Sequence, residues 1–338
     1  MDSWPDIQAS APAVPVSLSR AGVSQVEKVI RIGGPGARSS RLYSARLDCF
    51  VDLGPEQKGV HMSRFEEAVN DVIGEVILGE VALRAEVLAR HIAQRVRQRQ
   101  DALRAEVTIR ARYPEHKPAP VSGIATQEMY TLYASAVAFE HGTRQMVGVA
   151  AQGMTTHPGA QQLIADGVRE RLAADGFSDR QIDRILAAVP IVAESARGLG
   201  TLHIGCPEHC DVDIDAADLL TIVEDSMSSE VYELLKRSDE RAVIEKAHRR
   251  PRFVEDCVRE MLRAVLDRYG HLPDDAFVSA RHENLRTVHQ HNVVAERYGL
   301  LGDLRAERRG GDVAPHHTSR REWLEAVGAP PASDRPLA

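Results

Sequence analysis

Apolar side chains alternate with polar ones over several stretches of the chain. The clearest stretch covers residues 42–53, where Tyr43 and Leu47 share one side and Arg46 and Asp48 the other. A period of two is typical of a β-strand with one buried face, because successive side chains point to opposite faces. From alternation, or from short apolar runs between turn residues, we predict strands at residues 23–32, 42–53, 105–111, 129–139, 147–154, 201–204, 212–214, from 277 onward, and 289–298.

Other stretches repeat their apolar residues every three or four positions. Phe65, Val69 and Val72 begin one series that ends at residue 77, and a second series covers residues 83–96. That spacing places the apolar side chains on one face of a helix. Further helices are predicted at residues 161–172, 179–189 with Ser178 as the N-cap, 216–236, 239–247 and 254–269.

The order of these elements repeats along the chain. Residues 17–142 read as strand, strand, helix, helix, strand, strand, with a Pro-rich turn expected at residues 116–123, and residues 143–305 repeat that order with extra helices. Sheets covered on one face by helices give an α+β fold. We therefore predict an irregular arm at residues 1–16, two tandem units, and a tail at 306–338 that is disordered from Gly328.

Composition narrows the class of protein. The 338 residues are 43% hydrophobic and 27% charged, which is ordinary for a globular chain, and the formal net charge of -7 argues against a general nucleic-acid surface. No apolar run is long enough to cross a membrane, and residues 1–16 lack the basic start of a signal peptide. The four cysteines show no secreted disulfide spacing, so we expect a cytoplasmic protein without a membrane partner.

A Thr-His-Pro-Gly link at residues 156–159 joins a predicted strand to a predicted helix. Such a link places a side chain at the mouth of a site, which makes His157 the first candidate, although a lone loop histidine is often only solvated. Other residues with suitable chemistry recur along the chain. They are the carboxylates Glu194, Glu240 and Glu255, the pair His289 and His291, and the basic group Lys58, His61 and Arg64.

Four short stretches, taken in order, resemble one enzyme family. The stretches are Lys58–Phe65, Met227–Arg237, Pro251–Asp256 and Val288–His291. They are similar to the type IB GTP cyclohydrolases, the group that includes the archaeal enzymes of methanopterin synthesis. The likeness runs from Pro5 to about Arg305, and the long insert between Gln161 and Pro190 resembles the archaeal branch.

The resemblance implies a fold and a reaction. The family has the tunnelling fold with two units per chain, and it forms a homotetramer with sites between subunits. It uses a divalent metal to open the imidazole ring of GTP, releases formate, and recloses the product as a dihydroneopterin phosphate. Its metal site takes the first Cys of a Cys-Pro-Cys motif, a His of a His-Asn-Gln-Arg motif, and a downstream Glu and His, while a further Glu holds the guanine edge.

Carried over by position, the downstream residues match this pattern and the upstream residues do not. Glu240 falls on the metal-site glutamate, Glu255 on the purine anchor and His289 on the late histidine. His157 replaces the first Cys of Cys-Pro-Cys. Glu194 begins the stretch that replaces His-Asn-Gln-Arg, of which only Arg197, a substrate-binding candidate, survives.

The two upstream replacements keep the ligand capacity and the charge of the family's pair. A thiolate with a neutral imidazole carries one negative charge, as does an imidazole with a carboxylate, and both new groups can bind metals. The resemblance therefore implies one Fe(II), Zn(II) or Mn(II) ion per subunit, held by His157, Glu194, Glu240 and His289. His291 or Glu194 would move protons. The alternative is that His157 caps a helix and Glu194 is a solvated loop residue.

Several other interpretations stay open. Lys58, His61 and Arg64 either bind substrate phosphates or cap and bridge the helix that begins near Phe65. Cys206 and Cys210 suggest a zinc knuckle, but without a second pair free thiols fit better, and Cys206 at the metal is a further option. The predicted function is GTP cyclohydrolysis. Hydrolysis of another purine-like heterocycle in specialised metabolism and non-catalytic ligand binding are the alternatives.

Overall fold

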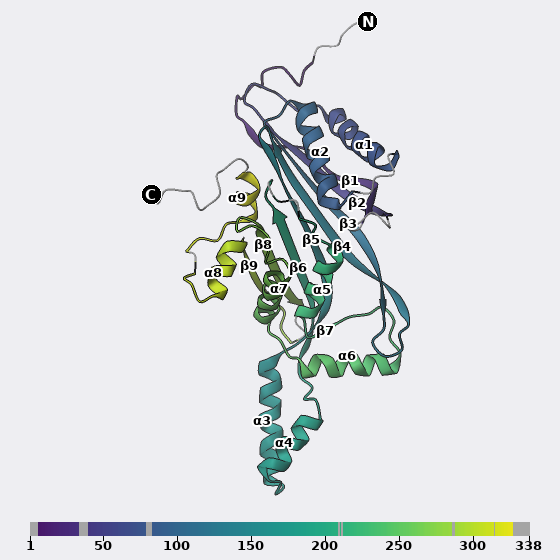
Figure 1. The fold of residues 1–338 in the computed structure, drawn as a ribbon, viewed down its shortest axis with the longest axis vertical. Helices are drawn as coiled ribbons and strands as arrows, with labels where there is room; N and C mark the ends of the chain where they lie inside the picture. The colour runs from purple at the N-terminus through teal and green to yellow at the C-terminus, as the bar shows by residue number, and fades with distance from the viewer. Residues whose placement is uncertain are drawn as a thin grey trace.

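The computed structural model describes residues 6–33, 40–78, 83–208, 210, 212–285, 288–313 and 315–326. Its strands form one antiparallel sheet in the order β1-β2-β3-β4-β5-β6-β8-β9, and the short strand β7 pairs with β5. Helices pack along this sheet, and a pair of helices projects from one end of the molecule (Figure 1).

The first half of the chain forms one strand-strand-helix-helix-strand-strand unit. Strands β1 (Leu18–Gly33) and β2 (Ser40–Leu53) precede helices α1 (Met62–Leu78) and α2 (Ala85–Gln100), and strands β3 (Arg104–Pro118) and β4 (Ala125–Phe139) follow them. In β3 the buried residues alternate with less buried ones, as the pattern of residues 105–111 predicts. Packing of the helices on this sheet buries the alternating apolar face.

The second half repeats the order with insertions. Its four long strands are β5 (Gly142–Thr156), β6 (Ser195–Cys206), β8 (Phe277–Leu285) and β9 (Val293–Leu300). Helices α3 (Pro158–Ala174) and α4 (Asp179–Ala188) are inserted between β5 and β6. Between β6 and β8 lie α5 (Ala216–Ser226), β7 (Ser229–Glu230), α6 (Arg237–Arg249) and α7 (Val254–Arg268). Helices α8 (Leu301–Arg308) and α9 (Arg320–Glu325) follow β9.

The two faces of the sheet are covered differently. On β4, Leu132 and Ala134 belong to the main core, which α1, α2, α5 and α7 cover, whereas Val137 belongs to a small second cluster with Trp323 of α9. Even- and odd-numbered residues of a strand face opposite sides, so α9 packs on the face away from the other helices. Trp323 is almost fully buried there, and its indole N–H donates to the Asp275 carbonyl at 2.8 Å.

The element order confirms the predicted α+β fold with two tandem units, the arrangement of the tunnelling fold. The predicted domain limits stay a prediction, because one continuous sheet runs through the junction of the two units. The tail predicted to be disordered from residue 328 lies outside the described residues. Within the described part of the chain, no helix is long and apolar enough to cross a membrane.

Four local predictions were wrong. Residues 212–214 are not a strand, and the helix predicted at 216–236 ends at Ser226 because the chain turns into β7, which pairs with β5. Residues 116–118 continue β3 instead of starting a turn, because they pair with residues 125–127 of β4. The strand predicted at 289–298 begins only at Val293, which leaves His289 and His291 in a bend.

Candidate active site

A cavity of about 270 Å³ lies where β5 ends, β6 and α7 begin, and β8 ends. Antiparallel pairing brings these ends together, because Thr156 of β5 lies opposite Ser195 of β6, and Arg197 of β6 lies opposite Leu285 of β8. The lining residues are Thr155, His157, Glu194, Ala196, Arg252, Phe253, Val254, Glu255, Asn284, His289, His291 and Val293. Five of the predicted site residues therefore share one pocket.

His157 is the N-cap of α3. Its Nδ1 atom accepts a hydrogen bond from the Ala160 backbone N–H at 2.9 Å, and its ring meets the Phe253 ring edge-on with centroids 5.2 Å apart. A neutral imidazole that accepts at Nδ1 carries its proton at Nε2. In this arrangement neither ring nitrogen offers a free lone pair to a metal. The structure therefore agrees with the alternative in which His157 caps a helix.

Glu194 lies across the base of the inserted hairpin from His157. The His157 backbone N–H donates to the Glu194 carbonyl at 2.9 Å, and the Glu194 side chain is half-buried. The hairpin α3–α4 leaves the sheet at His157 and returns at Glu194, and Figure 1 shows it extending away from the body. The Gln161 side-chain amide ties its base to the carbonyls of Ile191 and His248, at 2.8 and 2.6 Å.

Glu255 occupies the first turn of α7 and is exposed toward the pocket. The unpaired N–H groups at a helix N-terminus favour a nearby acceptor with negative charge, and the Glu255 carboxylate lies within this turn. Asp256, the next residue, caps the helix by accepting from the Phe253 N–H at 3.0 Å. With Asp256 in that role, Glu255 remains available to a ligand.

His289 and His291 lie in the bend before β9, with both side chains exposed. Their rings stack with centroids 5.0 Å apart and planes 18° from parallel. Two imidazoles at the wall of a pocket place ring nitrogens that can donate or accept hydrogen bonds beside a bound molecule.

The structure adds Asn284 to the pocket, a residue for which the sequence pattern raised no expectation. Asn284 is 5% exposed, and its Oδ1 atom lies 2.8 Å from Nε2 of the fully buried His282. Burial lowers the pKa of His282, which favours the neutral ring. The available signal was alternation, because residues 282 and 284 share one face of β8 and precede the His289–His291 bend.

Glu240 lies outside this pocket. It is exposed in the first turn of α6, whereas the neighbouring Asp239 is buried and accepts hydrogen bonds from Val121, Ser122 and Lys236. Burial alone would raise the pKa of Asp239, but these hydrogen bonds outweigh it and lower the pKa to about 2. Asp239 therefore fixes α6 to the β3–β4 turn, and Glu240 follows α6 away from the pocket.

The basic candidates also lie elsewhere in the chain. The His61 ring bonds to Asp6 at 2.9 Å and the Arg64 guanidinium donates to the Arg99 carbonyl at 3.3 Å, so both bridge the start of α1 to its surroundings. The Lys58 backbone N–H bonds to the carbonyls of Gln8 and Ser10. Arg197 is exposed on β6 next to the pocket residue Ala196, and successive residues of a strand point to opposite faces.

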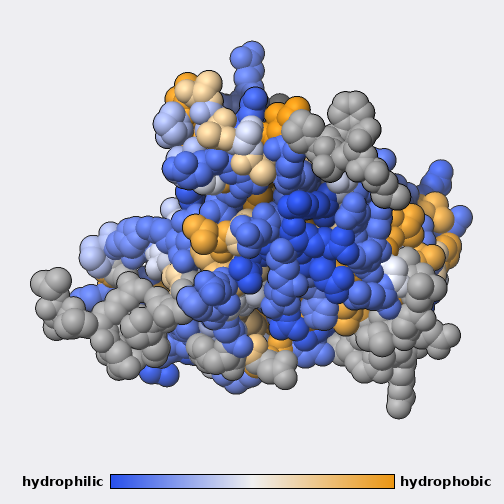
Figure 2. All heavy atoms as spheres, turned by 90° about the horizontal axis from the view of Figure 1, so that it is seen from above, coloured by the Kyte–Doolittle hydropathy of each residue, from blue (hydrophilic) through white to orange (hydrophobic). Residues whose placement is uncertain are grey.

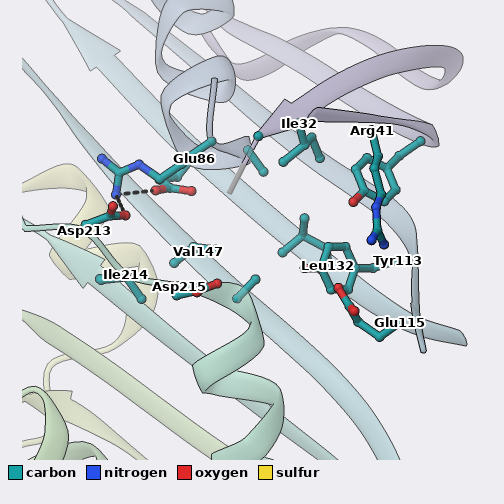
Figure 3. Close-up of a pocket in the computed structure, with 15 residues that line it drawn as sticks. Ile32, Arg41, Glu86, Tyr113, Glu115, Leu132, Val147, Asp213, Ile214 and Asp215 are labelled. Carbon is teal, nitrogen blue, oxygen red and sulfur yellow. Dashed lines mark hydrogen bonds and ion pairs between the residues drawn. The ribbon is translucent and has the colours of Figure 1, made fainter. Parts of the chain in front are cut away.

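A smaller cavity, of about 110 Å³, lies between the N-termini of α2 and α5 (Figure 3). Arg84 bridges the carboxylates of Glu86 and Asp213 at 3.3 and 2.7 Å on one side, and the rings of Tyr43 and Tyr113 stack on the other. None of the predicted site residues lines this cavity. The pocket around Glu255 brings the candidate acids, bases and anchor together and is therefore the candidate active site.

The sequence profile of the type I GTP cyclohydrolase folE2 family matches residues 4–295. The chain belongs to this family. GTP cyclohydrolase MptA of Methanothermobacter thermautotrophicus is 38% identical over 308 residues, which cover 90% of this chain and 96% of that protein. GTP cyclohydrolase MptA of Methanococcus aeolicus is 38% identical over 311 residues, covering 89% and 98%. The predicted family is confirmed, and its type is that of folE2 and MptA in place of the expected IB type.

The comparison with solved structures is weaker. A uricase from Arthrobacter globiformis aligns with a TM-score of 0.49 and 9% identity, over 88% of this chain and 96% of that chain. A uricase from Bacillus fastidious aligns with a TM-score of 0.43 and 8% identity, over 89% and 99%.

The metal-ligand set predicted for this family member does not come together within one chain. Among the described residues, no three His, Cys, Asp or Glu side chains are placed to share one ion. His157 uses Nδ1 for its cap, and Glu240 lies outside the pocket that holds Glu194 and His289. Cys206 and Cys210 are free thiols, and neither lines the pocket.

Proposed function

We propose that this chain is a GTP cyclohydrolase that opens the imidazole ring of GTP and releases formate, leaving a product that recloses to a dihydroneopterin phosphate. The observation that carries the proposal is the placement of Glu255 in one pocket with the imidazoles of His289 and His291 and the carboxylate of Glu194. Membership of the folE2 family and the GTP cyclohydrolase name of the MptA relatives support the substrate.

In this proposal Glu255 holds the guanine ring. Its carboxylate accepts hydrogen bonds from the ring N1–H and the exocyclic amine, both of which are donors, and charged acceptors make short, strong bonds. This bidentate contact fixes the ring plane against the pocket wall. Binding in this fixed orientation removes the entropy cost of orienting the ring from the following step, and so lowers its barrier.

The ring-opening step needs water at C8 and protons at the ring nitrogens. We propose that His291 or Glu194 takes a proton from the water as it adds to C8. The conjugate acid then protonates the nitrogen that leaves as the C8–N bond breaks. A second water attacks the resulting formamide, and the carbon departs as formate. The stacked imidazoles of His289 and His291 give the pocket a second group able to donate a proton.

A divalent ion remains part of the proposal, as Fe(II), Zn(II) or Mn(II) with Glu194 and His289 as ligand candidates. When bound, such an ion would lower the pKa of a coordinated water. The residues of one chain do not present the full ligand set, so the steps above are assigned to side chains alone. Elemental analysis of protein purified anaerobically with each metal supplied measures the occupancy, which we expect to be one ion per chain.

We further propose a homo-oligomer, a tetramer by the family resemblance, in which a second copy completes each site. Glu240, Lys58, His61 and Arg64 all lie outside the pocket of their own chain, so only another copy can bring them to it. Co-expression of Glu240→Ala chains with Glu255→Gln chains tests this. Mixed oligomers should regain activity that neither homo-oligomer has, whereas activity confined to parent chains would place each complete site within one chain.

The cap at His157 favours one alternative. With His157 capping α3, this chain departs from the family's metal site, and a changed site is compatible with another nitrogen heterocycle as the substrate. Incubation of the metal-supplied protein with GTP, followed by formate assay and mass spectrometry of the pterin product, distinguishes the two. Formate and a dihydroneopterin phosphate support the proposal. Turnover of a different heterocycle supports the alternative, and binding without turnover supports a non-catalytic role.

A further inference from the structure

Glycines on the neighbouring strand β6 leave space that the His282 side chain fills. It is fully buried on β8 opposite Gly200, and Asn284 lies opposite Gly198. A Cβ atom at Gly198 would come within 2.6 Å of His282 Nε2 and 3.1 Å of Asn284 Oδ1. Distances this short exclude a side chain, so the glycine makes room for the imidazole and the amide to lie side by side.

In this space, the Nε2 atom of His282 meets the Oδ1 atom of Asn284. Asn284 Oδ1 can only accept, so the 2.8 Å contact with His282 Nε2 requires a proton on Nε2. His282 Nδ1 is then a bare acceptor. It is buried without a hydrogen-bond partner among the described residues. A buried polar atom without a partner is costly, so this arrangement is a poor choice for stability alone.

The Asn284 amide consequently presents only its N–H groups, which are hydrogen-bond donors, to the pocket. Its oxygen is held by His282, and the described part of the chain offers its Nδ2 no hydrogen-bond partner, while the residue lines the pocket that contains Glu255. An amide free to rotate would present either an acceptor or a donor. An amide held at its oxygen presents N–H groups alone.

We propose that Asn284 is a specificity-determining residue that donates a hydrogen bond to the ring carbonyl of a 6-oxopurine. This inference rests on the proposed function and deepens it. The carbonyl O6 of guanine adjoins the N1–H that Glu255 accepts, so an acceptor from Glu255 and a donor from Asn284 together match the edge of guanine. Adenine has a bare N1 and a donor amine at C6, and therefore opposes both groups.

His282 acts in this scheme as a positioning residue. It touches Asn284 and lies beneath the pocket wall, and its N–H decides the direction of the amide. Replacement by Leu frees the amide to rotate. Replacement by Gln keeps a side-chain N–H donor near the same place, so we expect His282→Gln to retain most of the selectivity that His282→Leu loses.

The test uses 7-deaza-GTP and 7-deaza-ATP, which lack N7 and cannot undergo ring opening, and measures their dissociation constants by calorimetry on the full chain. The parent should favour the guanine nucleotide. Asn284→Asp keeps an oxygen for His282 but replaces the N–H donors with a carboxylate. It should lower the ratio of guanine affinity to adenine affinity at least about tenfold, which corresponds to one hydrogen bond.

Asn292→Asp is the matched control, because Asn292 lies nearby and exposed, its amide donating to Glu283 at 2.9 Å. It should leave the ratio unchanged, and thermal unfolding checks the fold of each variant. A folded Asn284→Asp protein with the parent's ratio would overturn this inference and leave the proposed function intact. A parent that binds no guanine nucleotide would overturn both. A parental ratio in His282→Leu would remove the positioning role.

Discussion

At the scale of single residues, the sequence predicted which groups share the pocket better than what each group does. One cavity is lined by five predicted residues: His157, Glu194, Glu255, His289 and His291. They come together because each motif lies next to the end of a strand or the start of a helix, and pairing in the sheet brings these ends together. The cap made by His157 depends on Pro158 starting a helix at once, and spacing alone could not separate it from metal binding.

The capping role of His157 predicts a stability effect. His157→Ala removes the acceptor for the Ala160 N–H and should lower the free energy of unfolding by about 1 kcal/mol, whereas Asn, a good capping residue, should restore most of it. Thermal or chemical unfolding of the three proteins measures this. Equal losses in the Ala and Asn variants would show that the cap contributes little and that the imidazole itself is needed.

His203 predicts a pH dependence of stability. It lies half-buried on β6 beside the Tyr133 ring, and its loss of contact with water, followed by the charge of Arg320, lowers its pKa to about 3. Because the folded pKa lies below the unfolded value of about 6.5, its contribution is complete above pH 6.5 and is lost as the pH falls toward 3. At pH 5 the loss should be about 2 kcal/mol.

Denaturant unfolding at pH 7 and pH 5 measures that loss, with His203→Gln as the comparison. The variant lacks the titrating ring, so its stability should fall less between the two values by about 2 kcal/mol. An identical fall in parent and variant would mean that His203 stays solvated enough to titrate normally.

At the scale of elements, local patterns predicted well which helices and strands exist, but predicted poorly where each one begins and ends. The helix expected at 216–236 stops at Ser226 because Ser229 and Glu230 pair with Met154 and Gly153 of β5, a contact invisible to local periodicity. Helix α9 was missed for a similar reason. It has only six residues and is held by Trp323 packing on Phe277 and by Arg144 bonding to the Trp323 carbonyl at 2.7 Å.

The inserted hairpin should be the least protected helical element. Helix α3 has no buried residue and α4 has only Ile182, so little tertiary packing opposes their opening. Isolated helices of this length are marginal in water. Hydrogen exchange followed by mass spectrometry should show amides of 160–172 exchanging at least about tenfold faster than those of α2. Equal protection would indicate that another copy of the chain covers the hairpin.

At the scale of the whole molecule, repetition of the element order was the strongest signal, and it gave the α+β class and the tandem units. The sequence did not predict which of the candidate site residues lie outside the pocket in a single chain. Asp239 anchors α6 to the β3–β4 turn and carries Glu240 away from the pocket. The face of the molecule drawn in Figure 2 is mainly hydrophilic among the described residues, and its apolar atoms lie in separate patches.

The central claim is that the pocket around Glu255 binds the guanine ring of GTP, and Glu255→Gln tests it most directly. The amide turns one acceptor oxygen into a donor, so GTP should bind at least about tenfold more weakly and formate release should fall with it. Glu245→Gln is the matched control, because Glu245 lies on the exposed surface of α6 and, within the described residues, pairs with Arg241 alone. Parental GTP affinity and turnover in Glu255→Gln would contradict the account.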